Sequence, residues 1–306
     1  MKYKLEDRLI WFKDALVPIK DAQIMVFSPT AQFGLNVFEG IPCFWNDGKS
    51  KLFGFRIYDH FKRLQNSAKL LSLKNTYTID DMFGALTKTI MANEVKEDIS
   101  IRQTLFVDDF GSWTSDGPVY MFVVATPKNK LSSEYNHDGL HVCISSWTRI
   151  NDNSISPRIK CGANYINSRM GQLEALKNGY NTCLFLNENK KVSEGPGSCL
   201  FIIKNEKLIT PRLTDSVLES ITRDSVFKIA KLLDYEVVER TIDRTELYTA
   251  DEVFLCGSAM GITPILSIDK YEITNEIGTI TKEIKTKYFN IARGDDVDFT
   301  EWITEL

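Results

Sequence analysis

The sequence predicts an α/β (α+β) fold with two domains. Runs of β-branched and aromatic residues alternate with runs of helical spacing in both halves of the chain, which is typical of mixed proteins. The stretch TPKNKLSSEYNHDG, at 126–139, is polar and typical of a linker. The length of 306 residues also favours two domains, because one domain commonly takes roughly 100–200 residues.

The first half of the chain contains both helices and strands. SIRQTLFV at 100–107 and VYMFVVA at 119–125 are rich in β-branched and aromatic residues and predict strands. A helix is expected over 58–71, with these apolar residues on one face: Phe61, Leu64, Ala68 and Leu71. A second helix is expected after Thr78, because a hydroxyl can accept hydrogen bonds from the free amides of a first turn.

The second half repeats this alternation. Strands are expected over 140–146, 182–186 and 199–203. Helices are expected over 165–178, 221–233 and 280–292. Gly179 is a natural stop for the first of these helices, because glycine tolerates a positive φ. We therefore expect a smaller N-terminal α/β domain at 1–127, a linker at 128–139 and a larger C-terminal domain at 140–306.

Composition and charge exclude several classes of function. The net charge of −4 argues against nucleic acid as a partner, because a phosphate backbone favours a basic face. No apolar run is long enough to cross a membrane, so no membrane partner is expected. The first eight residues are charged and lack the apolar core of a signal peptide, which predicts a cytoplasmic protein.

Cysteine and histidine usage argues against disulfides and metal sites. The 6 cysteines are dispersed without a CxxC pair, and we interpret them as buried, reduced thiols. The chain has only 3 histidines, which leaves little material for a histidine metal site or a nucleophile–histidine pair. No metal is expected, and a thiol enzyme that uses Cys161 would lack a convincing histidine partner.

Lys160 is a candidate nucleophile. Three small residues, Cys161, Gly162 and Ala163, follow it and leave room for a bulky group beside its amine. A lysine in a confined, partly dry pocket loses its proton more easily and attacks an aldehyde more readily. Most lysines are solvated surface groups, so the residue types alone leave both interpretations open.

The turn SEGPG, at 193–197, presents a glutamate. Gly195-Pro196-Gly197 favours a tight turn before a strand, and an exposed hairpin turn is the plainer interpretation. In the functional interpretation, the Glu194 carboxylate faces the nitrogen of a pyridine ring and keeps that nitrogen protonated.

Two further segments offer backbone amides to an anion. LESITRD at 218–224 opens a helix, and a helix N-terminus favours phosphate. CGSA at 256–259 follows an apolar strand and adds a hydroxyl. Arg63 can supply a fixed positive charge to the same phosphate. Ordinary capping and turn formation explain both segments equally well.

Taken together, these segments resemble the class IV (fold type IV) aminotransferases that use pyridoxal 5'-phosphate (PLP), and most closely the branched-chain amino acid aminotransferases. The resemblance covers nearly the whole chain, and its landmarks occur in family order. They are VFEGI at 37–41, FKRL at 61–64, the segment 157–165, SEGPG at 193–197, ITRD at 221–224, and GSA at 257–259 followed by ITP at 262–264.

The resemblance implies a role for each matching residue. Lys160 forms the Schiff base with the cofactor and moves the proton, Glu194 pairs with the pyridine nitrogen, and Tyr165 donates towards the phenolic oxygen. The contacts to the phosphate and to the ring face are implied for Arg63, Leu218, Ile221, Thr222 and Ser258. The C-terminal domain is thereby expected to bind PLP, with the active site at the junction of the two domains.

The resemblance also implies the substrate contacts, namely Phe38, Arg102, Ser258 and Ala259. The amides of Ser258 and Ala259 correspond to those that bind the substrate α-carboxylate. Arg102 matches an arginine that family members use for a substrate carboxylate, and a surface ion pair at a strand end is an equal alternative. The departures from the branched-chain pattern, most of them around the substrate, are Phe33, Pro42, Ser100, Lys128, Ser198, Cys199 and Ser220.

The expected function is therefore the transfer of an amino group from an L-amino acid, branched-chain or otherwise apolar, to 2-oxoglutarate, in branched-chain amino acid biosynthesis. The resemblance implies at least a homodimer. Alternatives within the fold are a D-amino acid or (R)-amine aminotransferase, or an aminodeoxychorismate-type lyase. The alternative from another class is a cofactor-free module that binds anions or partners, in which Lys160 is a surface lysine.

Overall fold

The computed structural model describes residues 4–128 and 139–306, and these form two compact units. The first unit comprises Met1–Leu131, Ile159–Ala163 and Asn290–Leu306, and the second comprises Ser132–Arg158 and Asn164–Phe289. The linker expected at 128–139 lies almost wholly outside the described residues.

Two segments of the first unit differ from the expected domain boundaries, which place 159–163 and 290–306 in the C-terminal domain. Both segments pair with strands of the first unit. Cys161 forms a β-bridge with Val37, and strand β15 (Ile303–Glu305) pairs with strand β4 (Lys51–Phe55). Such long-range pairing leaves no local signal in the sequence, so a single cut at the linker could not anticipate it.

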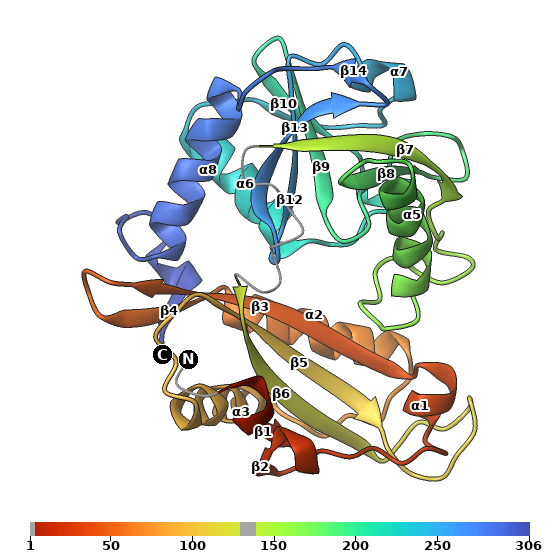
Figure 1. Ribbon diagram of the computed structural model, residues 1–306, viewed down its shortest axis with the longest axis vertical. Helices are drawn as coiled ribbons and strands as arrows, with labels where there is room; N and C mark the ends of the chain where they lie inside the picture. Colours follow the sequence, from red (N-terminus) through yellow and green to blue (C-terminus); the bar gives the residue numbers. More distant parts are fainter. Residues whose placement is uncertain (1–3, 129–138) are drawn as a thin grey trace. The chain divides into compact units, whose positions relative to one another are not determined.

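The first unit is built on a seven-stranded antiparallel sheet with strand order β15-β4-β3-β5-β6-β1-β2 (Figure 1). Its other strands are β1 (Leu9–Phe12), β2 (Ala15–Pro18), β3 (Asn36–Asn46), β5 (Ile99–Val107) and β6 (Val119–Pro127). Every second residue of β6 is buried, because alternate side chains of a strand point to opposite faces of a sheet. One face of this sheet therefore carries the core.

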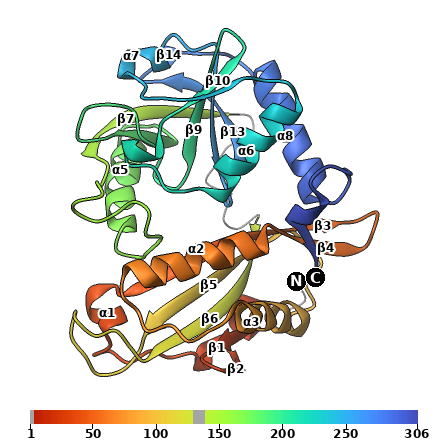
Figure 2. The same cartoon turned by 180° about the vertical axis from the view of Figure 1, so that it is seen from behind.

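Two helices cover that core. Residues of α2 (Ile57–Leu70) and α3 (Ile79–Ala92) form one buried cluster with β3, β5 and β6, and Figure 2 shows α2 crossing in front of β5 and β6. Thr78 caps α3 as expected: its hydroxyl accepts from the Asp81 amide, and the Asp81 carboxylate accepts from the Thr78 amide. The short helix α1 (Pro29–Phe33) precedes β3.

The second unit is built on a mixed sheet with strand order β11-β10-β9-β12-β13-β7-β8. Its strands are β7 (Leu140–Thr148), β8 (Thr182–Leu186), β9 (Cys199–Lys204), β10 (Lys207–Thr210), β11 (Val237–Glu239), β12 (Glu252–Gly257), β13 (Gly261–Ile268) and β14 (Tyr271–Glu272), which pairs with β13. Its helices are α5 (Tyr165–Lys177), α6 (Ile221–Leu232), α7 (Arg244–Leu247) and α8 (Thr279–Ala292), whose C-terminal end belongs to the first unit.

Short 3₁₀ helices complete the described chain at Leu5–Asp7, Ile19–Asp21, Leu213–Asp215 and Thr300–Trp302. The expected strands β5 to β9 and the expected helices are confirmed, each within two residues at either end. Gly179 has φ 78°, as expected for the residue that ends α5. The mixed α/β fold is thus the one that the sequence predicts.

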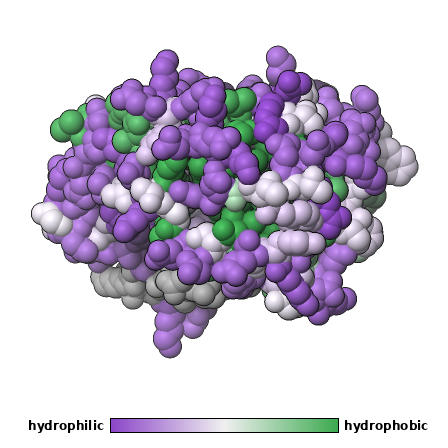
Figure 3. All heavy atoms as spheres, turned by 90° about the horizontal axis from the view of Figure 1, so that it is seen from above, coloured by the Kyte–Doolittle hydropathy of each residue, from purple (hydrophilic) through white to green (hydrophobic). Residues whose placement is uncertain are grey.

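The cysteines are buried, as expected. All six are free thiols. Burial raises the pKa of the Cys43 and Cys256 thiols to about 12, so neither forms a thiolate near neutral pH. Hydrophilic side chains predominate on the face shown in Figure 3, with hydrophobic residues in patches between them. Within residues 4–128 and 139–306, no helix combines the length and the apolar character needed to cross a membrane.

Lys128 gives a prediction for the pH dependence of stability. Its ammonium lies 4.4 Å from the centroid of the Phe44 ring. Burial lowers the pKa of Lys128 from 10.5 to about 8, against the opposing charge of Asp98. Between these values the unfolded chain holds a proton that the folded chain has lost. The free energy of unfolding therefore rises with pH between about 8 and 10.5, as far as Lys128 determines it. This contribution is fully present above about pH 10.5 and is lost as the pH falls to about 8.

We expect Lys128→Met to be more stable than the parent protein at pH 7.5, by on the order of 2 kcal/mol, because a half-buried charge is removed. This advantage should shrink between pH 8 and 10. Urea unfolding of both proteins across this range measures the difference. Lys62→Met, at an exposed position of α2, is the control and should show no such trend. A constant difference at every pH would contradict the prediction.

Candidate active site

The first unit holds Lys160 between a strand and a helix. The Phe38 amide of β3 donates to the Lys160 carbonyl at 2.9 Å, and the Lys160 amide donates to Ser67 Oγ of α2 at 3.1 Å. Gly162 follows in a tight space, because a Cβ there would lie 3.0 Å from Asn36 Oδ1. A glycine at 162 therefore lets this segment pack closely against Asn36 of β3.

The Lys160 side chain is half-buried and reaches an aromatic ring. Its Nζ lies 5.2 Å from the centroid of the Phe38 ring, and Phe38 itself is buried. The Arg102 guanidinium, from β5, lies 4.0 Å from the same centroid, since Arg102 is paired with Gly40 across the two strands. Two of the predicted residues, Lys160 and Arg102, thus lie at the ring of a third, Phe38. Both are cations, and together they favour an anionic ligand.

The fourth predicted residue of this unit, Arg63, is held by a buried carboxylate. Glu39 Oε1 accepts from Arg63 Nε at 2.6 Å, and Glu39 Oε2 accepts from Arg63 Nη2 at 2.8 Å. Glu39 Oε2 is also 2.6 Å from His60 Nδ1. Burial raises the pKa of Glu39, but the charge of Arg63 and the hydrogen bonds from Arg63 and His60 outweigh burial and hold this pKa well below its usual range.

In the second unit, Glu194 is buried and paired with an arginine. Its Oε1 accepts from Arg149 Nη2 at 2.8 Å and from Arg149 Nε at 3.1 Å. Arg149 Nη1 donates to Ser168 Oγ at 3.2 Å and to Asn167 Oδ1 at 3.3 Å, both on α5. Glu194 is only 3% exposed. The interpretation of this segment as a hairpin turn with an exposed glutamate is therefore wrong.

The other oxygen of Glu194 faces Leu218 and Cys199. The Leu218 amide donates to Glu194 Oε2 at 3.3 Å, and Cys199 Sγ lies 3.6 Å from the same oxygen. Burial and then the Glu194 charge raise the pKa of Cys199 well above its ordinary value, so the thiol stays protonated and donates. Two predicted residues, Glu194 and Leu218, are thus in direct contact.

The two expected anion-binding segments lie at the ends of regular elements. Ser220 caps α6, because its Oγ accepts from the Arg223 amide, and the helix then opens with the buried residues Ile221 and Thr222. Ser258 and Ala259 follow β12, and the preceding Gly257 approaches the glutamate turn so closely that a Cβ would lie 3.1 Å from the Gly197 carbonyl oxygen. The 257–259 segment therefore lies beside the 194–197 turn.

Tyr165 is the first residue of α5, and it is partly exposed. The same helix supplies Asn167 and Ser168, which bind Arg149 and through it Glu194. The structure thereby connects the helix that begins at Tyr165 to the glutamate through one arginine.

Three residues of these clusters were missed by sequence reasoning as functional candidates: Glu39, His60 and Arg149. Glu39 belongs to the VFEGI landmark, but its local sequence contains nothing that indicates an arginine 24 residues later as its partner. Arg149 follows directly after strand β7, where an arginine is usually a solvated strand end. Only the folded chain brings each of them to its partner.

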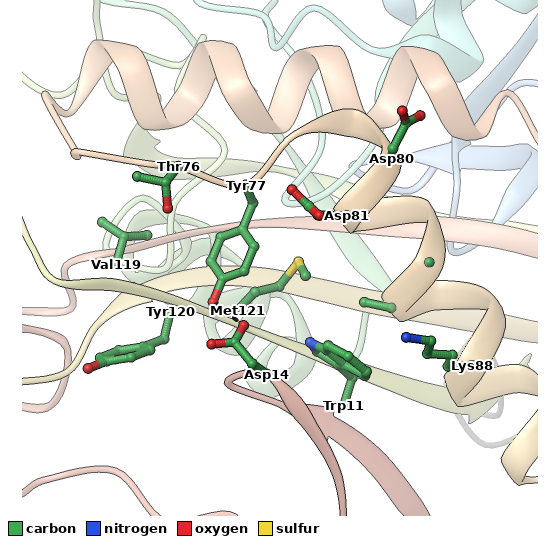
Figure 4. Close-up of a pocket in the computed structure, with 12 residues that line it drawn as sticks. Trp11, Asp14, Thr76, Tyr77, Asp80, Asp81, Lys88, Val119, Tyr120 and Met121 are labelled. Carbon is green, nitrogen blue, oxygen red and sulfur yellow. Dashed lines mark hydrogen bonds between the residues drawn. The ribbon is translucent and has the colours of Figure 1, made fainter.

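A separate pocket of about 550 Å³ lies in the first unit between α3, β6 and the β1–β2 hairpin (Figure 4). Its lining includes Trp11, Asp14, Tyr77 and Lys88. These side chains interact with one another: the Tyr77 hydroxyl donates to Asp14 at 3.1 Å, and Lys88 Nζ lies 5.1 Å from the Trp11 ring centroid. None of the predicted cofactor or substrate residues lines this pocket.

Comparison with known proteins gives one consistent result. Residues 36–268 match the family described as Amino-transferase class IV. A probable branched-chain-amino-acid aminotransferase of Aquifex aeolicus is 35% identical over 304 residues, which cover 97% of this chain and 96% of that protein.

Solved structures agree over the full length. A branched-chain amino acid aminotransferase of Thermobaculum terrenum, in its PLP form, has a TM-score of 0.92 and 38% identity, and the match covers 99% of each chain. A second branched-chain amino acid aminotransferase, from the organism abbreviated T.th. and complexed with N-(5'-phosphopyridoxyl)-L-glutamate, has a TM-score of 0.91 and 30% identity, covering 98% of this chain and 99% of that chain. With a family match over more than half of its residues and full-length relatives in sequence and structure, this chain belongs to the class IV aminotransferases.

Proposed function

We propose that this protein is a PLP-dependent branched-chain amino acid aminotransferase that passes the amino group of an L-amino acid to 2-oxoglutarate through Lys160. Full-length relatives are named as branched-chain amino acid aminotransferases, and a similar structure holds a phosphopyridoxyl derivative of L-glutamate, the amino acid that corresponds to 2-oxoglutarate. The observation that carries the proposal is the agreement in sequence and fold over at least 97% of this chain.

The side chains present fit PLP. Lys160 offers an amine to the cofactor aldehyde, and the segment after it is kept small by the close approach to Asn36. Arg63 and the first amides of α6 are groups that bind a phosphate dianion. Glu194 is a buried carboxylate next to Arg149, which suits it to accept from a protonated ring nitrogen. Tyr165 is assigned to the phenolic oxygen, Leu218 to the ring face and Ser258 to the phosphate.

PLP supplies an aldehyde that condenses with amines and a ring that withdraws electrons from the substrate α-carbon. The residues of this chain do the rest. Lys160 would take the proton from the substrate α-carbon through its Nζ and would then donate this proton to the carbon that comes from the cofactor aldehyde. One amine can serve both positions only if it is held within hydrogen-bond reach of each. The backbone contacts of Lys160 to Phe38 and Ser67 provide such a fixed base for the side chain.

The substrate carboxylates are assigned to two sets of groups. The amides of Ser258 and Ala259 bind the α-carboxylate, and Arg102 binds the second carboxylate of 2-oxoglutarate or L-glutamate. Arg102 is exposed, and its guanidinium carbon lies 4.0 Å from the centroid of the Phe38 ring, a cation–π contact that favours this position of the side chain. Phe38 thereby serves both as apolar contact for the substrate side chain and as support for Arg102.

A donor screen tests the proposed function. The purified protein is supplied with PLP and 2-oxoglutarate and is offered L-leucine, L-isoleucine, L-valine, L-alanine and the D-enantiomers. We expect turnover of the branched L-amino acids to exceed that of the others. Turnover of D-alanine without turnover of L-leucine would indicate the D-amino acid aminotransferase instead. A protein that retains no PLP absorption band after free PLP is removed by gel filtration would refute the proposal.

We also propose that the protein is at least a homodimer. The first unit exposes large apolar side chains in two segments that are far apart in the sequence: Val26 at 71% and Phe27 at 62% in one, and Phe110 at 78% and Trp113 at 73% in the other. Phe27 and Phe110 are in ring contact at 5.9 Å, so these residues share one surface. Such a patch favours a protein partner. Light scattering on the eluting protein should give at least twice 34.9 kDa, and a monomer mass would contradict the proposal.

The free cysteines support a reducing compartment, and we infer a cytoplasmic location from them.

A further inference from the structure

We propose that Glu39 and His60 are positioning residues that orient the Arg63 guanidinium for the phosphate of PLP. This inference rests on the proposed function of Arg63 as a phosphate ligand. It assigns a role to two residues that contact neither substrate nor cofactor in the proposed site.

The geometry of the pair fixes the guanidinium plane. Glu39 binds Arg63 through both of its oxygens, at 2.6 and 2.8 Å, which is the bidentate arrangement that Arg forms with a carboxylate. These bonds use the Nε–Nη2 edge of the guanidinium. The bidentate contact restricts rotation of the side chain, so the opposite edge keeps a defined direction.

His60 fixes the carboxylate in turn. Its Nδ1 lies 2.6 Å from Glu39 Oε2, and His60 and Arg63 stand three residues apart on the same face of α2. Both Glu39 and His60 have no exposed surface. Within residues 4–128 and 139–306, the buried His60 Nε2 atom has no hydrogen-bond partner.

This orphaned nitrogen identifies the tautomer. Burial lowers the pKa of His60. The Glu39 carboxylate raises this pKa, while the charges of Arg63 and Lys160 lower it further, and the net shift is downward. A neutral ring leaves only an unprotonated Nε2 without a partner, which costs less than an unpartnered, charged N–H. His60 therefore donates Nδ1–H to Glu39 and contributes no charge to the cluster.

The charge balance argues for orientation as the purpose. Glu39 is an anion close to an arginine that is assigned to a dianion, so by charge alone it weakens phosphate binding. A buried ion pair is also weak evidence for stability, because apolar side chains of similar volume often stabilise as well. An arginine held in one direction is the benefit that remains.

Glu39→Gln separates the effect of the Glu39 charge on the phosphate from its effect on the orientation of Arg63, because it keeps the shape of the side chain and removes the charge. If charge alone mattered, this variant would bind PLP more tightly. If orientation matters, the weaker contact to Arg63 lowers the affinity, and we expect about a tenfold or greater loss, as for other partners that orient a ligand. Titration of the apoprotein with PLP and with pyridoxal, which lacks the phosphate, measures this directly.

Only the affinity for PLP should fall, while that for pyridoxal should stay unchanged, because both ligands offer the same aldehyde to Lys160. His60→Leu should show a smaller loss in the same direction, and His60→Asn should restore binding, since its amide can donate from the Nδ1 position. Glu94→Gln, at an exposed site, is the control. Melting of each apoprotein verifies that it is folded.

An unchanged or higher affinity of Glu39→Gln for PLP would overturn the inference, as would an equal loss for pyridoxal. Failure of the proposed function has a different signature, because the parent protein would then bind neither ligand.

Discussion

Replacing Lys160 with alanine abolishes transamination and leaves the fold intact. The variant lacks the amine that binds the cofactor aldehyde and moves the proton, so we expect turnover to fall by at least about 10³-fold. The visible absorption band of the PLP-bound protein should be lost or shifted to that of free PLP. Borohydride should then no longer fix the cofactor to the protein.

Two observations make the variant informative. Lys160 is held through its backbone to Phe38 and Ser67, so removal of the side chain leaves these bonds in place. Lys62→Ala, an exposed lysine of α2, is the matched control and should keep both band and activity. Added methylamine should restore part of the activity of Lys160→Ala, because it supplies a proton acceptor. A variant that retains activity without added amine would remove Lys160 from the proposed role.

Local sequence predicted the regular elements well, because the signals for them are local. Thr78 and Asp81 lie three residues apart and cap the same helix, and alternation along β6 reports which face is buried. Strand β3 had no such signal, since Gly40 and Pro42 interrupt its apolar run. The eleven residues of β3 instead follow from pairing with β4 and β5, which the chain reaches only when folded.

The candidate site shows the same limit. Composition left Lys160 as one lysine among many, and the ordered motifs of the family singled it out. Neither composition nor the family motifs predicted the contacts that hold these candidate residues in place. Glu39 lies 24 residues from Arg63, and Arg149 lies 45 residues from Glu194, so neither distance along the chain indicates contact. A family motif thus nominates candidate ligand contacts more readily than it nominates the residues that hold those contacts in place.

Arg149→Met is expected to be among the most destabilising single substitutions in the second unit. It removes the only arginine bound to Glu194 among the described residues and leaves a carboxylate that is 3% exposed without a counter-charge. Breaking a buried pair in this way costs about 3–5 kcal/mol. Urea unfolding of the apoprotein measures the loss. Arg240→Met, from a pair that is about one-third exposed, should lose at most about 1 kcal/mol.

The double variant Arg149→Met with Glu194→Gln separates stability from function. Gln carries no charge, so we expect the double variant to regain most of the stability that Arg149→Met loses. Activity should not return, because Gln cannot keep the ring nitrogen of PLP protonated, and Glu194→Gln alone should already lower turnover by at least about 10²-fold.

The combination also decides what Arg149 does. Its guanidinium carbon lies 5.7 Å from the centroid of the Phe185 ring, so packing alone is the competing explanation for its contribution to stability. A double variant no more stable than Arg149→Met would support packing. Recovery of stability without recovery of activity would instead mean that Arg149 exists to keep a charged Glu194 in the protein interior, where the proposed chemistry needs that charge.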